Sequence, residues 1–157
     1  MAETDFLEKL ASDLKTACIQ SIELGKRIEN ILVETNKGFE KQGKVTKKIA
    51  LRMFKKNAGM KIEEWIQYAS STIPELEKFS SAVENGDIEV QNQIKPNLLE
   101  YKEKLRHLSD YYEKTADLVK KFLKDPEELK NSLEGLNNSR KRIDLFIQVI
   151  QLIEKET

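Results

Sequence analysis

Apolar and polar residues alternate along the chain in steps of three and four. In the first 36 residues this spacing places a run of apolar or small side chains on one side of a helix: Leu7, Leu10, Leu14, Ala17, Ser21, Leu24, Ile28 and Ile31. The spacing predicts one helix about 45 Å long, at ~1.5 Å per residue. Because a helix of that length does not fit a compact globule, the pattern favours an elongated bundle.

The next segment is short and basic. Gly38 and Gly43 bracket a polar loop, and residues 41–61 then predict an amphipathic helix that closes between Asn57 and Gly59. A glycine at this position suits the left-handed conformation that ends many helices.

A longer apolar stripe follows from residue 62 to residue 83 and ends at the turn residues 85–87, Asn-Gly-Asp. Pro74 interrupts this stripe, and Thr72 and Glu75 have the spacing of a helix-capping box. The region therefore predicts either two helices that meet there or one helix that is kinked.

A second long stripe is expected from about Pro96 to Lys124. The residues DPEE at 125–128 then start the last helix. Asp125 can cap it, Pro126 suits its first turn, and Glu128 completes a capping box.

The last helix is unusually apolar over residues 143–153, where side chains without charge cover most of its circumference. Such a helix needs more than one neighbour. One interpretation makes it the central helix of the bundle. The alternative is that one side meets a second chain, with candidate interface residues Leu145, Phe146, Val149 and Leu152.

These elements predict an all-α fold: an elongated, mainly antiparallel bundle of four long helices with a short basic helix in the first connection. Residues 1–157 are expected to form one helical-bundle domain, since this length suits a single domain. The composition agrees, because 34% of residues are charged and only three prolines and six glycines are present to make turns.

The expected location is the cytoplasm. The acidic, amphipathic N-terminus does not resemble a secretory signal, and no apolar window reaches the length of a membrane span. Cys18 is the only cysteine, so an intramolecular disulfide cannot form. We expect Cys18 to be shielded beside the first stripe and chemically quiet.

The residue inventory argues against an enzyme. His107 is the only histidine, which rules out the paired Glu-x-x-His motifs of a di-iron bundle and a histidine-rich zinc site. Glu103 precedes it by one helical turn, but such a pair is usually an exposed surface contact. No glycine-rich phosphate-binding loop occurs. We therefore predict no catalytic residues, no metal and no cofactor.

The aromatic residues recur at helical spacing and are expected to pack in the core: Trp65, Tyr68, Phe79, Tyr101, Tyr111 and Tyr112. The sequence does not exclude a cavity for an apolar ligand between the helices.

Charge is distributed very unevenly although the formal net charge is zero. Residues 41–61 contain eight basic and no acidic side chains, whereas residues 1–40 contain five and eight and residues 62–157 contain fourteen and nineteen. On a helical wheel Lys48, Arg52, Lys55 and Lys56 share one face with Lys44 nearby. The apolar residues, Ile49 among them, spread over the opposite half and beyond.

Three interpretations of this basic helix compete. Acids on neighbouring helices balance it, in exposed pairs worth about 0 to 1 kcal/mol each. Alternatively, it meets an acidic surface, either a protein partner or anionic lipid headgroups. Contact with nucleic acid ranks last, because one basic, aromatic-poor turn in an otherwise acidic chain gives weak, salt-sensitive binding.

The sequence thus predicts a non-enzymatic interaction protein. It binds a protein partner through the basic helix at 41–61, the apolar helix at 143–153, or both. The alternative is a peripheral membrane or lipid-binding bundle that uses the same basic helix, and association with further copies of the chain stays open.

Overall fold

The structure, a computed structural model, describes residues 6–157. A helical turn at residues 6–8 is followed by five helices: α2 (Leu14–Glu40), α3 (Lys44–Ala58), α4 (Ile62–Asn85), α5 (Ile88–Phe122) and α6 (Pro126–Glu156). No strand occurs within the described residues. The predicted all-α bundle of four long helices and one short basic helix is confirmed.

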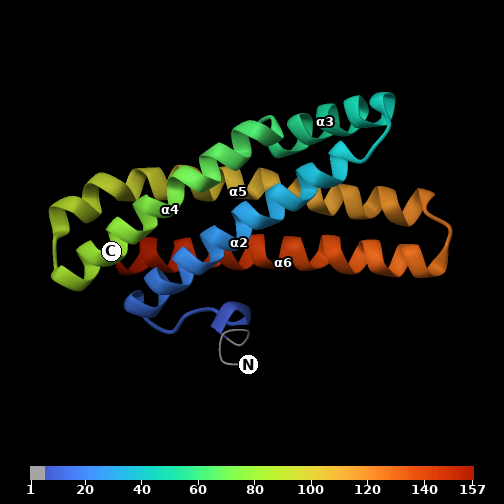
Figure 1. Cartoon of the computed structure of the whole chain (residues 1–157). Coiled ribbons are helices and arrows are strands. Elements are labelled where there is room, and N and C mark those ends of the chain that lie inside the picture. Colours follow the sequence, from blue (N-terminus) through green and yellow to red (C-terminus); the bar gives the residue numbers. More distant parts are fainter. Residues whose placement is uncertain (1–5) are drawn as a thin grey trace.

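The long helices run mainly antiparallel and make an elongated molecule (Figure 1). Helix α2 packs against both α4 and α6, α5 packs along α6, and α3 lies on α5. At one end of the molecule the α2–α3 turn and the α5–α6 turn diverge, so the bundle ends there in a fork (Figure 1). The basic helix forms one side of that fork.

Several helix ends follow the expected chemistry. Gly59 closes α3 with a φ of 88°, and Gly86 closes α4 with a φ of 68°. Residues other than glycine rarely adopt this left-handed backbone conformation. Asp125 caps α6 by accepting a hydrogen bond from the Glu127 backbone N–H, with Pro126 at the first position.

The predicted start of the first helix was wrong. Helix α2 begins at Leu14, because the Asp13 carboxylate accepts a hydrogen bond from the Thr16 backbone N–H and caps the helix there. The preceding segment instead binds the buried side chain of Gln20, which donates to the carbonyl oxygens of Phe6 and Lys9 and accepts from the Ala11 backbone N–H. The apolar spacing continues from Leu7 to Leu14, but the hydrogen bonds of the Gln20 side chain hold this segment outside the helix.

Neither internal proline ends a helix. Helix α4 is continuous through Pro74, and the hydroxyls of Ser71 and Thr72 both donate to the Tyr68 carbonyl oxygen one turn earlier. Helix α5 begins at Ile88 rather than near the expected Pro96, which lies inside it.

Aromatic side chains fill the middle of the core, as predicted. The Tyr101 ring lies 5.2 Å from Tyr68, 5.4 Å from Phe146 and 6.2 Å from Trp65, measured between ring centroids. Nearby, α2 and α4 approach closely at Gly25, where a Cβ atom would lie 2.9 Å from Leu76 Cδ1. Aromatic packing thus fills the core, and the lack of a side chain at Gly25 allows the close approach of α2 and α4.

Helix α6 occupies a central place. Its apolar segment packs against α5 on one side and α2 on the other, and Ile143, Phe146, Val149 and Ile150 are fully buried. The interpretation of residues 143–153 as the inner helix of the bundle therefore accounts for most of their apolar character. Among residues 6–157, no helix has the length and apolar character that crossing a membrane requires.

Candidate binding surface

A small number of buried contacts fixes the orientation of α3. Only Phe54 and Ala58 of this helix are buried. The Phe54 ring makes edge contacts with Tyr111 at 4.7 Å and Phe39 at 6.2 Å between centroids. At the end of the helix the Trp65 indole N–H donates to the Ala58 carbonyl oxygen at 2.9 Å. These contacts lie in the second half of α3 and turn its opposite side to solvent.

The cations predicted from the sequence all lie on that outer side. Lys44, Lys48, Arg52, Lys55 and Lys56 are exposed, and α3 contains no acidic residue. We call these five residues the basic face.

The basic face is not neutralised by neighbouring helices. Among residues 6–157, none of its five members forms an ion pair within 4.0 Å. The one ion pair of α3 joins Lys47 to Glu40 at 2.8 Å, across the α2–α3 turn. This pair fits the balanced-surface interpretation for Lys47, whereas the five cations of the basic face have no such partner within residues 6–157.

The apolar residues of α3 are not confined to the side that packs on the bundle. Ile49 is 53% exposed and Val45 is 73% exposed. The physical reason is that the buried strip of α3 is narrow and lies toward its C-terminal end. Two apolar side chains therefore stand in solvent among the cations.

A groove runs between α3 and the end of α5. It has a volume of about 340 Å³ and is lined by Met53, Asn57, Lys114, Asp117, Leu118 and Lys121. The Lys114 ammonium donates to Asn57 Oδ1 at 3.4 Å across it. Sequence reasoning did not identify the α5 side, because residues near 53 and near 118 are far apart in the chain and no local pattern links them.

A second groove flanks the other edge of α3, where the helix meets the start of α4. Its volume is about 380 Å³, and its lining residues are Leu51, Arg52, Lys55, Lys61, Ile62 and Glu63. Two members of the basic face, Arg52 and Lys55, thus lie at its rim.

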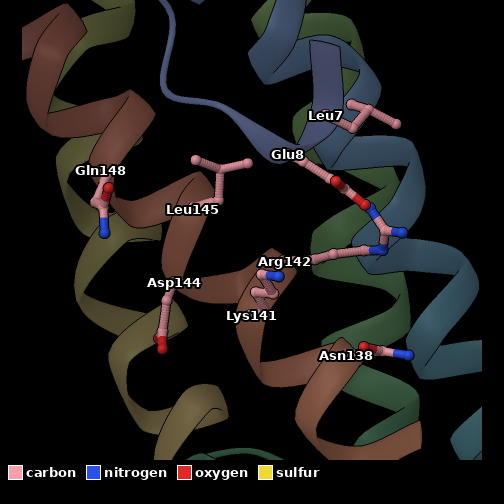
Figure 2. A pocket seen from close by; sticks show the side chains of 8 residues that line it. All are labelled: Leu7, Glu8, Asn138, Lys141, Arg142, Asp144, Leu145 and Gln148. Carbon is pink, nitrogen blue, oxygen red and sulfur yellow. The ribbon is translucent and has the colours of Figure 1, made fainter. Parts of the chain in front are cut away.

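The apolar interface predicted on α6 is mostly internal. Phe146 and Val149 are fully buried between α6 and its own neighbours, so this fold leaves them no access to another chain. Leu145 and Leu152 are partly buried. Leu145 also lines a pocket of about 270 Å³ beside the N-terminal segment, where Glu8 and Arg142 point toward one another (Figure 2). The mixed charges around this pocket favour no particular ligand.

No constellation for catalysis is visible in the described residues. No group of three or more His, Cys, Asp and Glu side chains is placed to hold a metal between residues 6 and 157. Glu103 pairs with Arg106 at 3.4 Å. Burial raises the pKa of Cys18 to about 11 and also raises the pKa values of Tyr101 and Tyr112.

Comparisons with protein families, with curated proteins and with solved structures gave no match for this chain.

Proposed function

We propose that this protein is a non-enzymatic binding protein of the cytoplasm that docks on an acidic surface of another protein through the basic face of α3. The observation that carries the proposal is a helix with no acidic residue and five exposed cations, none of which forms an ion pair within residues 6–157. Concentrated charge of one sign steers partners of the opposite sign and contributes to specificity.

The packing of α3 favours a protein over a lipid bilayer. An amphipathic helix binds at a membrane interface by burying its apolar face among the lipids. In α3 that face is already used, because Phe54 and Ala58 are buried against the bundle. Shallow grooves also run along both edges of α3, and a protein element can fill them.

A peripheral membrane role is the second candidate, and one observation favours it. Val45 and Ile49 project between the cations, and apolar side chains flanked by lysines are a combination that anionic membranes bind. Each Lys or Arg near such a surface contributes about 1 kcal/mol.

The test compares three proteins in affinity capture from a lysate of the source cells. They are wild type, a variant with Lys48, Arg52, Lys55 and Lys56 changed to Glu, and a control. The control changes four exposed lysines outside α3 to Glu: Lys9, Lys15, Lys78 and Lys155. Both variants change the net charge equally, so a difference between them reports the position of the charges. Circular dichroism first checks that all three are equally helical.

We expect a discrete set of acidic proteins to bind wild type and the control but not the α3 variant, with binding weakened by salt. Vesicle flotation with anionic and with neutral lipid runs in parallel. Flotation of wild type on anionic lipid alone, lost in the α3 variant, together with no selective protein capture, would replace the proposal by the membrane candidate. Equal capture by all three proteins would contradict both.

A further inference from the structure

The groove between α3 and α5 has an apolar side chain on each of its walls. Met53 of α3 and Leu118 of α5 line the same groove. One helical turn from each, Ile49 precedes Met53 and Phe122 follows Leu118. Because α3 and α5 run antiparallel, both steps lead in the same direction, toward the open end of the fork (Figure 1).

These side chains are unusually exposed for their size. Phe122 is 71% exposed and Leu118 is 36% exposed on α5, while Ile49 is 53% exposed on α3. Together with Met53 we call them the apolar track. Ile49 and Phe122 lie one helical turn beyond the groove lining, and a cluster of exposed apolar side chains is typical of an interaction site.

Cations border the apolar track. Lys114 and Lys121 line the groove on α5. Asp117 is the only acidic residue in the lining. The site therefore combines an apolar floor with a rim that is largely positive.

We infer that the apolar track is a docking groove for an acidic amphipathic helix of the partner protein. Such a helix presents apolar side chains at i, i+3 or i+4, and i+7, which match a track that advances by helical turns on both walls. Acidic side chains on its flanks meet the lysines of the rim. The inference rests on the proposed function and specifies the chemical nature of the partner.

The charges select this occupant over two others. A second copy of the chain, docked by a two-fold axis on the same groove, would bring two sets of the groove lysines, Lys114 and Lys121, into one interface. A bilayer is planar and leaves the space between the two helices unfilled. An acidic helix satisfies the charge and the shape together.

The test uses a synthetic helical peptide of roughly 18 residues, about five turns. It is built from Leu, Glu and Ala, with the leucines on one face. A first control peptide has the same composition but leucines spread around the helix, and a second keeps the leucine pattern with Lys in place of Glu. Binding is measured by calorimetry, and backbone NMR shifts locate the contact.

Two double variants distinguish binding in the groove from nonspecific hydrophobic binding. One changes Ile49 and Phe122 to Ser, and the matched control changes Ile19 and Ile88 to Ser, since these are exposed isoleucines away from the fork, 47% and 62% exposed. All four side chains are solvent-exposed, so both variants should fold. Circular dichroism and thermal melting check this before binding is measured.

We expect the patterned acidic peptide to bind, to shift resonances of α3 and of the end of α5, and to lose affinity by about tenfold or more in the Ile49→Ser, Phe122→Ser variant. The Ile19→Ser, Ile88→Ser variant should bind as wild type does. Equal binding of the scrambled peptide, unchanged affinity in the groove variant, or no binding of the patterned peptide would overturn the inference. Binding to anionic vesicles in place of the peptide would also overturn it.

Failure of the groove and failure of the proposed function give different results. If the groove variant still captures the same cellular proteins that wild type captures, while reversal of the basic face removes them, the docking groove is wrong and the proposed function stands. If reversal of the basic face removes nothing, the proposed function itself is wrong.

Discussion

The attachment of α3 to the bundle depends on one aromatic side chain, and this can be tested by truncation. Phe54 is fully buried, and its ring contacts those of Tyr111 and Phe39. Truncation of a buried phenylalanine to alanine lowers the free energy of unfolding by about 3–5 kcal/mol. The only other buried residue of α3 is the much smaller Ala58. We therefore expect Phe54→Ala to release α3 locally before the rest of the bundle unfolds.

Hydrogen exchange measures this directly. A loss of 3 kcal/mol corresponds to a change of more than about 100-fold in the opening equilibrium. Amide protection in α3 should fall by at least that factor in Phe54→Ala, while α4 and α6 keep most of theirs. Phe79→Ala is the matched control, because Phe79 is a buried phenylalanine of α4. It should lower the global free energy of unfolding without selectively exposing α3. Unchanged protection in α3 after Phe54→Ala would refute the reasoning.

Four further predictions concern the rest of the molecule. Ile147→Asp should unfold the protein or sharply lower its melting temperature, because Ile147 is buried and the substitution places a charge in the inner helix; an unchanged melt would mean that α6 is not packed as described. The Cys18 thiol should react with a thiol reagent only as the protein opens, and rapid labelling of the native protein would contradict its burial. Its pKa is raised from 9.0 to about 11, so the unfolded chain loses this proton first and the stability present below pH 9 should decline as pH rises toward 11; unfolding titrations that show constant stability over this range would argue against it. Gln20→Ala should free residues 6–11, seen as faster exchange and proteolysis there, with α2 retained.

The fold was largely predictable because its signals are local. Gly59 and Asp125 end and start helices through chemistry contained within a few residues, and both predictions are confirmed. The errors arose where polar contacts over longer distances decide. The Gln20 side chain binds a segment nine to fourteen residues away, and the spacing of Leu7, Leu10 and Leu14 contains no sign of that.

The binding surface was predictable only in part. The charge run marked the cations of α3, and the structure places all five on one exposed side. What the sequence could not indicate is the contribution of α5, because Leu118 and Phe122 fit the apolar stripe of a packed helix. Their exposure follows from the divergence of the two helix pairs, a property of the assembled bundle (Figure 1).

The central claim is that the basic face of α3 contacts an acidic protein, and photo-crosslinking tests it most directly. A photoreactive lysine analogue is introduced at position 48 in one sample and at position 78 of α4 in another, and each is irradiated in a lysate of the source cells. The account predicts a discrete protein adduct from position 48 that disappears when Arg52, Lys55 and Lys56 are changed to Glu, with no such adduct from position 78. Adducts only with lipid, or the same adducts from both positions, would contradict it.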